Sequence, residues 1–233
     1  MTSPFLLAPS VIAADFTRLG AELAACESAG ADWLHVDIMD GHFVPNLSMG
    51  PMIVEACRRA TQLALNVHLM IESPERYFEA FTRAGAAHIL VHAEACPNLS
   101  DSIQQIKSLG CKAGVVINPP TPVSAIESVL PILDQVLVMT VHAGFGGQTF
   151  MPEVLPKVAE LRAKLDALGS LAVLEIDGGV TAANLPSAFE AGARAFAGGT
   201  SVFRHSQGIA AGIRALRNAL TPGPSPIGRV VQG

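Results

Sequence analysis

Short apolar runs alternate along the chain with segments in which apolar residues recur at helical spacing. The runs predict eight strands, at residues 5–10, 33–39, 63–69, 87–92, 112–118, 135–140, 171–177 and 194–197. The periodic segments predict a helix after each strand, at residues 15–29, 51–60, 74–84, 99–109, 121–130, 152–168, 184–191 and 209–220. Strands that alternate with helices in this way indicate a parallel sheet.

Eight strand–helix units in about 220 residues favour one closed barrel over an open, doubly wound sheet. The first turn of a nucleotide-binding open sheet would read GxGxxG, whereas the segment 9–15 reads PSVIAAD. We therefore expect an α/β protein with a single (β/α)8 TIM barrel over residues 1–220. Three prolines fall in residues 221–233, which we expect to form a mobile tail.

The second predicted strand carries polar residues on one of its faces. His35, Asp37 and Met39 share one face, because side chains alternate along a strand, and apolar residues occupy the other face. Burying an imidazole and a carboxylate together is costly unless both have partners. A lone histidine on a strand is usually a hydrogen-bonded structural residue, but this pair favours a divalent metal as the partner.

Composition narrows the class of protein. Half of the 233 residues are hydrophobic and 15% are charged, which is enough apolar material for one large core. No apolar run reaches the roughly 18 residues that span a bilayer, and the N-terminus lacks the basic region of a signal peptide. The net charge of −5 without a basic tract gives no sign of nucleic-acid binding. The four cysteines form no CxxC pair, so we interpret them as reduced thiols of a cytoplasmic protein.

Chemistry in a TIM barrel takes place at the carboxyl ends of the strands. His35 and Asp37 end the second predicted strand, His68 ends the third and Asp177 ends the seventh. Their mixed nitrogen and oxygen donors suit one divalent cation, and zinc, iron(II), manganese and cobalt all remain open. Three methionines fall beside this site, either as core filling or as a soft apolar floor under a planar intermediate; they are Met39, Met70 and Met139.

Glycine clusters follow the last three strands. They are Gly144-Phe145-Gly146-Gly147, Gly178-Gly179 and Gly198-Gly199-Thr200. Three such clusters on one rim favour exposed backbone amides that bind a phosphate, over plain turns. None of the four lysines lies at the carboxyl end of a predicted strand, which disfavours a Schiff-base aldolase.

Two carboxylates, a cation and a phosphate site suggest a reaction. Removing a proton next to a ketone requires a base and stabilisation of the resulting enediolate, which a metal supplies as a Lewis acid. Asp37 and Asp177 come from strands three steps apart around the ring, so they could stand on opposite faces of a substrate. A second carboxylate that returns a proton to the opposite face inverts the carbon.

The chain resembles the ribulose-phosphate 3-epimerase family over residues 5–217. The segments that carry the resemblance are Ala8-Pro9-Ser10, Ala14-Asp15-Phe16, His35-Val36-Asp37-Ile38-Met39-Asp40-Gly41-His42-Phe43-Val44-Pro45-Asn46, Val67-His68-Leu69-Met70, Gly144-Phe145-Gly146-Gly147-Gln148 and Asp177-Gly178-Gly179-Val180. The resemblance implies a metal-dependent isomerase that interconverts D-ribulose 5-phosphate and D-xylulose 5-phosphate in the pentose phosphate pathway. It also implies a homo-oligomer, from dimer to hexamer. The charge and the lack of a long apolar run lead us to expect no nucleic-acid or membrane partner.

The resemblance assigns roles to individual positions. Asp37 and Asp177 look like the acid and base. The metal ligands would be His35, Asp37, His68 and Asp177. Ser10 and His68 would touch the substrate. The residues that contact the substrate chiefly through its phosphate would be Gly144, Phe145, Gly146, Gly147, Gly178, Gly179, Gly199 and Thr200.

Three positions depart from the family's commonest wording. Asn66 stands where aspartate is frequent, Ala143 replaces a proline whose loss would loosen its loop, and Thr200 replaces serine but keeps the hydroxyl. Two other functions stay open beside the pentulose-phosphate epimerase. One is a sister epimerase acting on allulose 6-phosphate, and the other is a non-catalytic phosphate-binding barrel, which would have lost a carboxylate or ligand.

Overall fold

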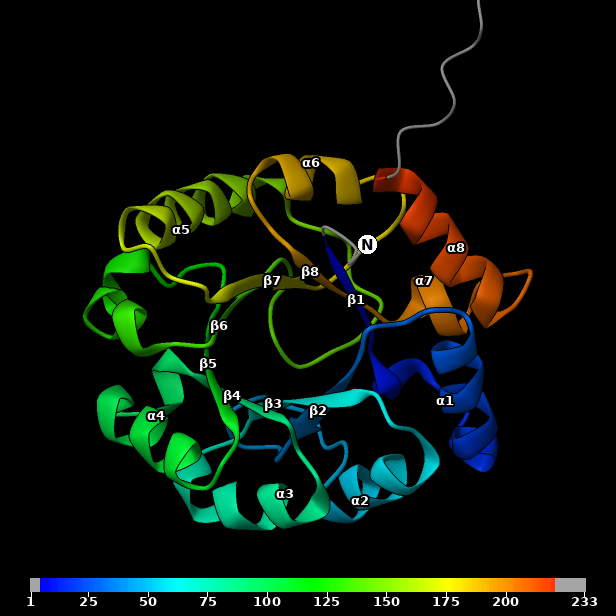
Figure 1. Ribbon diagram of the computed structural model, residues 1–233, viewed down its shortest axis with the longest axis horizontal. Coiled ribbons are helices and arrows are strands. Elements are labelled where there is room, and N and C mark those ends of the chain that lie inside the picture. Colours follow the sequence, from blue (N-terminus) through cyan, green and yellow to red (C-terminus); the bar gives the residue numbers. More distant parts are fainter. Residues whose placement is uncertain (1–4, 221–233) are drawn as a thin grey trace, which may run out of the picture.

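The computed structural model describes residues 5–220, in which eight parallel strands are surrounded by helices (Figure 1). The strands are β1 (Leu6–Pro9), β2 (Trp33–Met39), β3 (Ala64–Met70), β4 (His88–His92), β5 (Lys112–Ile117), β6 (Gln135–Met139), β7 (Val173–Asp177) and β8 (Ala195–Gly198). Their order in the sheet is β1-β8-β7-β6-β5-β4-β3-β2. The prediction of a (β/α)8 barrel is confirmed, whereas the predicted tail at 221–233 lies outside the described residues.

The two ends of the sheet meet between β1 and β2. Ser10 and His35 form a parallel bridge there. The backbone N–H of Asp32 donates to the carbonyl oxygen of Leu7 at 2.9 Å, and the N–H of Leu7 donates to Asp32 Oδ2 at 2.7 Å. A carboxylate therefore completes the ring where the regular ladder stops.

Helices cover the outside of the ring (Figure 1). The α-helices are α1 (Leu19–Ser28), α2 (Pro51–Ala60), α3 (Phe78–Ala84), α4 (Leu99–Ser108), α5 (Leu155–Ala167), α6 (Leu185–Glu190), α7 (Thr200–Phe203) and α8 (Ile209–Leu220). Shorter 3-10 turns lie at Val11–Ala13, Phe16–Arg18, Pro74–Tyr77, Ala93–Ala95, Val123–Ala125, Glu127–Ile132 and Pro152–Val154. Among the described residues, none of these helices combines the length and the apolar character needed to cross a bilayer.

The prediction of an α-helix at residues 121–130 is wrong. The chain forms two 3-10 turns there, Val123–Ala125 and Glu127–Ile132. Pro122 precedes the first turn and Pro131 lies inside the second. A proline has no N–H to donate and disfavours helical geometry in the residue before it, so Pro131 opposes an α-helix at the carboxyl end of this segment.

One helix was absent from the predicted set. The sequence predicts a single helix after the eighth strand, but α7 forms first, directly after Gly199, and α8 follows. Four residues are too few to show helical periodicity, which is why the pattern does not reveal α7. Its position after the last strand places it on the rim of the barrel.

Apolar side chains form two layers around the sheet. The outer layer packs strands against helices and contains most of the buried core. The inner layer fills the barrel with Leu90, Val116, Leu137, Met139 and Val141. Because side chains alternate faces along each strand, the inner layer and the polar site share the same face of the sheet.

Gly114 on β5 gives a test of this inner packing. An alanine Cβ there would lie 2.2 Å from Leu90 Cδ2 and 3.2 Å from both the Cβ and the carbonyl oxygen of Gln135. We expect Gly114→Ala to lower the free energy of unfolding by about 2 kcal/mol through overpacking, measured by urea unfolding. Gly146→Ala is the control, since nothing lies within 4 Å of its Cβ; equal stability of both variants would contradict the packing.

Candidate active site

Four ionisable side chains converge at the carboxyl ends of three strands. His35 and Asp37 come from β2, His68 from β3 and Asp177 from β7. One ligand atom of each lies within 4.8 Å of the corresponding atoms of the other three. The structure therefore brings together all four side chains that the sequence proposes as metal ligands.

Each histidine turns one particular nitrogen toward the carboxylates. His35 Nε2 lies 3.2 Å from Asp37 Oδ1 and 3.6 Å from Asp177 Oδ2. His68 Nδ1 lies 3.0 Å from Asp37 Oδ1 and 3.8 Å from Asp177 Oδ2. Both imidazoles are fully buried, while 15% of the Asp177 side chain reaches solvent.

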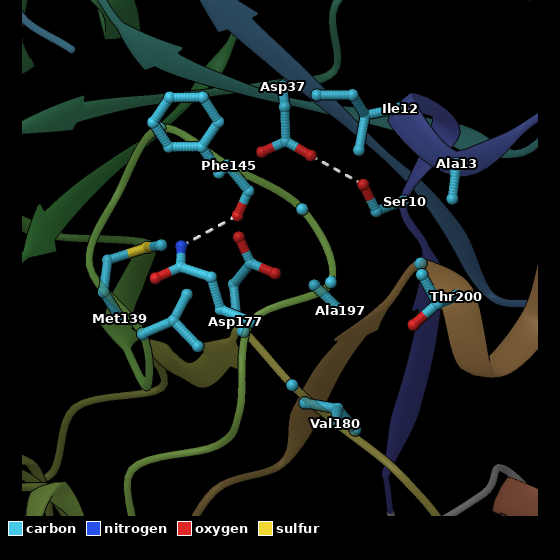
Figure 2. Close-up of a pocket in the computed structure, with 18 of the residues that line it drawn as sticks. Ser10, Ile12, Ala13, Asp37, Met139, Phe145, Asp177, Val180, Ala197 and Thr200 are labelled. Carbon is cyan, nitrogen blue, oxygen red and sulfur yellow. Dashed lines mark hydrogen bonds between the residues drawn. The ribbon is translucent and has the colours of Figure 1, made fainter. Parts of the chain in front are cut away.

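The two carboxylates point into the same space (Figure 2). Asp37 enters from one side and Asp177 from the other, and Ser10 holds Asp37 in place by donating its hydroxyl to Oδ2 at 2.6 Å. Thr140 fixes the end of β7, because its hydroxyl donates to the backbone carbonyls of Asp177 and Gly178 at 2.9 and 2.7 Å. A molecule between the carboxylates would meet one on each side.

The pKa values of these four groups shift in different directions, because each side chain meets a different balance of burial and neighbouring charge. Burial and the neighbouring negative charge of Asp37 raise the pKa of Asp177 to about 7. For Asp37, burial is outweighed by His35 and His68, so its pKa lies below the usual range. Burial lowers the pKa of His68 to about 4. Burial also opposes charge on His35, but Asp37 and Glu175 together raise its pKa well above the ordinary value.

A pocket opens above the carboxylates. Nine of the predicted substrate-binding residues line it, and they are Ser10, Gly144, Phe145, Gly146, Gly147, Gly178, Gly179, Gly199 and Thr200. Its apolar wall includes Met39, Met70 and Met139, as the sequence indicates. His68 is fully buried and does not line the pocket, so its contact with a substrate stays a prediction.

The loop after β7 requires its two glycines. Gly178 and Gly179 have φ angles of +119° and +65°, which residues with a Cβ rarely adopt. A Cβ on Gly179 would also lie 2.5 Å from the backbone nitrogen of Phe150. The loop can therefore pass close to its neighbour only without side chains, which leaves its backbone facing the pocket.

The pocket contains little positive charge. No lysine or arginine is among the described residues that line it, and His142 is the one lining side chain that can become cationic. An anion bound there would have to rely on backbone N–H groups and hydroxyls such as that of Thr200.

Hydrogen bonds hold the loop after β6 over the pocket. Asn46 donates its amide to the carbonyl oxygen of Gly144 at 2.8 Å. The Gln148 amide donates to the carbonyl oxygens of His142 and Phe145 at 2.6 and 2.9 Å. The predicted loosening of this loop by Ala143 stays a prediction.

Three buried or half-buried polar residues near the site were absent from the predicted set. His92 ends β4, and its Nε2 lies 2.9 Å from His68 Nε2. Glu94 follows two residues later, with Oε2 3.2 Å from His92 Nδ1. Glu175 on β7 is fully buried and lies 3.4 Å from His35 Nδ1. The available signal was position: His92 ends a predicted strand, and Glu175 shares a face with Asp177 two residues further on.

The donor set fits a divalent cation. Two imidazole nitrogens and two carboxylates suit a first-row transition metal, and their close approach in a buried site calls for a positive charge between them. Glu175 Oε1 is a buried oxygen without a hydrogen bond of normal geometry among the described residues, and it faces His35. Such an outer carboxylate is the usual companion of a metal-binding histidine.

Comparisons with solved structures agree with the fold. A 3-hexulose-6-phosphate synthase matches 93% of this chain and 100% of its own, with a TM-score of 0.69 and 16% identity. The tryptophan synthase α-subunit of Pyrococcus furiosus matches 92% of this chain and 98% of its own, with a TM-score of 0.68 and 13% identity. At these identities the likeness concerns the barrel alone.

Sequence comparisons give the family. A chain named ribulose-phosphate 3-epimerase from Bacillus subtilis is 53% identical over 86% of this chain and 93% of its own. Its namesake from a Synechocystis strain is 49% identical over 96% of this chain and 98% of its own. A chloroplastic ribulose-5-phosphate-3-epimerase from Arabidopsis thaliana is 48% identical over 86% of this chain and 72% of its own. The profile of the ribulose-phosphate 3 epimerase family matches residues 6–203, and the chain belongs to this family.

Proposed function

We propose that this protein is an isomerase that interconverts D-ribulose 5-phosphate and D-xylulose 5-phosphate. The observation that carries the proposal is a pair of carboxylates, Asp37 and Asp177, that face one pocket above two buried imidazoles (Figure 2). Family membership supplies the sugar phosphate, and the geometry supplies an acid and a base for inverting one carbon.

We propose that one divalent cation, zinc, iron(II), manganese or cobalt, binds to four side chains. These are His35, Asp37, His68 and Asp177. When bound, the cation would act as a Lewis acid that polarises the ketone and offsets negative charge developing on the substrate oxygens. The protein's part is to hold four donors ready on rigid strand ends, so that little reorganisation accompanies binding.

The carboxylates would carry the proton in opposite directions. Asp37, held ionised by its histidine neighbours, would take the proton from C3 on one face of the sugar. The electrons of the broken C–H bond pass into the adjacent ketone and form an enediolate. Asp177, on the opposite side of the pocket, would give a proton to C3 from the other face. One carboxyl group on each face of the carbon is suited to these paired roles.

The methionine side chains would keep water from the reacting carbon. Met39, Met70 and Met139 line the pocket on its apolar side. Thioethers present an apolar, polarisable surface without competing for the proton. We propose that the planar enediolate lies against them.

The phosphate would bind at the rim formed by the loops after β7 and β8. Gly178, Gly179, Gly199 and Thr200 line this part of the pocket, and α7 begins at Thr200. A TIM barrel commonly binds phosphate at these two loops together with a short extra helix. The glycines Gly144, Gly146 and Gly147, with Phe145 and Ser10, would close around the rest of the sugar.

We further propose a cytoplasmic protein that forms a homo-oligomer. The four cysteines are free and buried, which suits a reducing compartment. Leu47 and Met52 expose about three quarters of their surface, 75% and 74%. Exposed apolar residues of this size, close together in the chain, suit contact with a second copy.

Sedimentation velocity tests the oligomer. We expect the wild-type protein to sediment as a species larger than the 24.3 kDa chain, and Leu47→Lys with Met52→Lys to shift it toward the single chain, because buried charge opposes association. A wild-type protein that sediments as a single chain would overturn this proposal.

Proton NMR in D2O tests the reaction. With ribulose 5-phosphate, we expect xylulose 5-phosphate that carries deuterium at C3. Asp37→Asn and Asp177→Asn should each lower turnover by about a thousandfold or more, because an amide can neither take nor give the proton. Removing metal with a chelator should stop turnover, and adding back zinc or iron(II) should restore it.

Asp134→Asn is the matched control, since this aspartate lies at the other end of the barrel before β6 and caps the Ala113 N–H. It should leave turnover unchanged. Normal turnover by either active-site variant would end the two-carboxylate mechanism. Exclusive turnover of allulose 6-phosphate would identify the sister epimerase, and no exchange on either sugar would leave a binding protein.

A further inference from the structure

Two carboxylates lie behind the proposed cation site, and neither enters the mechanism above. Glu175 is fully buried in the barrel, on the same strand as Asp177. Glu94 lies beyond β4 and reaches the site only through the buried ring of His92. Burying the Glu175 carboxylate at this depth is costly unless it has a partner that needs it, whereas Glu94 keeps 27% of its side chain exposed.

The two histidines of the site face it with different nitrogens. His35 presents Nε2 and His68 presents Nδ1 to the carboxylates of Asp37 and Asp177. A neutral imidazole has one N–H and one lone pair, and only the lone pair can bind a cation. His35 must therefore carry its hydrogen on Nδ1, and His68 must carry its hydrogen on Nε2.

Glu175 is placed to receive the hydrogen of His35. Its Oε2 accepts hydrogen bonds from the side-chain amides of Asn66, at 2.8 Å, and of Gln135. Its Oε1 is left over and lies 3.4 Å from His35 Nδ1. The Asn66 amide nitrogen also lies 3.4 Å from His35 Nδ1, but its shorter bond, at 2.8 Å, goes to Glu175. The Oε1 acceptor therefore favours the tautomer of His35 that leaves Nε2 free.

Glu94 imposes the other tautomer on His68 through one intermediate ring. His68 Nε2 lies 2.9 Å from His92 Nε2, so one of the two nitrogens must donate and the other must accept. Glu94 Oε2 lies 3.2 Å from His92 Nδ1 and, as an acceptor, draws the hydrogen of His92 to that nitrogen. The Asn118 amide nitrogen lies 3.3 Å from the same atom, but Asn118 Oδ1 is buried without a partner, and turning that amide over would give the hydrogen a second acceptor. His92 Nε2 then accepts from His68, which leaves the lone pair of His68 on Nδ1.

We propose that Glu175, directly, and Glu94, through His92, are positioning residues that fix opposite tautomers of His35 and His68 and so present both lone pairs to one divalent cation. This inference rests on the proposed cation site. It assigns a function to groups outside the four ligands, where the partners of a metal-bound histidine usually set its orientation and basicity.

Substituting either glutamate by glutamine keeps the shape of the side chain but places an NH2 donor where a carboxylate oxygen accepted a hydrogen bond. In Glu175→Gln the new carbonyl would take the two amides of Asn66 and Gln135, and the new NH2 would face His35 Nδ1. In Glu94→Gln the carbonyl would keep the backbone N–H of Asn118 and the hydroxyl of Thr121. The NH2 would then face His92 and move its hydrogen to Nε2, against His68. An amide in place of a carboxylate can impose the wrong tautomer on a catalytic histidine in this way.

Zinc titration of the metal-free protein, in competition with a chromophoric chelator, tests the proposal. We expect Glu175→Gln and Glu94→Gln to bind zinc about 10- to 100-fold more weakly than wild type. Glu127→Gln is the control, because this carboxylate lies on the outside and pairs with Lys164. In a His92→Phe background, Glu94→Gln should have no further effect, since its route to His68 is gone.

Long-range 1H–15N NMR of the histidine rings gives a readout apart from affinity. In the metal-free wild type, where no cation dictates the tautomer, we expect the hydrogen of neutral His68 on Nε2, and Glu94→Gln should shift it to Nδ1. Circular dichroism checks that each variant is folded. If only one variant folds, it still tests the positioning role of the glutamate that it replaces. Zinc binding within twofold of wild type, with unchanged tautomers, would overturn the positioning role. No zinc binding by wild type would instead overturn the cation site itself.

Discussion

A barrel of parallel strands sends every second side chain into a space that water scarcely enters, and this constraint governs the whole site. Apolar groups such as Leu90, Val116 and Leu137 fill one part of this space, and buried polar side chains such as Gln135 and Glu175 hydrogen-bond one another in another part. At the carboxyl end the space holds imidazoles and carboxylates, which can stay there only if each meets an opposite charge or a hydrogen-bonding partner. The arrangement of the site is largely the solution to that problem.

The polar side chains of the site form an inner and an outer group, which are held in place by different parts of the chain. Inner groups such as Asp37 and His68 sit on strands, whose positions the surrounding ladder fixes on both sides. Outer groups such as Glu94 lie just past strand ends and are held by loop atoms of Asn118 and Thr121. The orientation of the inner side chains thus depends on the loop that contains Asn118 and Thr121, which is not part of a regular helix. The two consecutive prolines before Thr121 stiffen that segment.

The extent to which sequence predicts this molecule follows the range of the interactions involved. Strand alternation is local, so the shared face of His35 and Asp37 could be predicted from two residues. Their approach to Asp177 required only the rule that parallel strands end together. Position alone places His92 at the end of a strand beside β3, but nothing local distinguishes a histidine that orients a neighbouring ring from a structural histidine, so its role could not be predicted. The error at 121–130 arose where a proline overrides apolar spacing, and α7 is shorter than one period of the pattern that would reveal it.

The shortage of positive side chains around the pocket has a consequence for how a substrate arrives. A phosphorylated sugar approaching a chain of net charge −5 meets no lysine or arginine among the described residues of the pocket wall. Long-range attraction therefore contributes little to the encounter, and added salt should screen a weak repulsion rather than an attraction. If the phosphate binds at the proposed rim, recognition would take place at contact, through backbone dipoles that no side-chain substitution can remove. Such a rim would depend on the course of the main chain more than on the identity of its side chains.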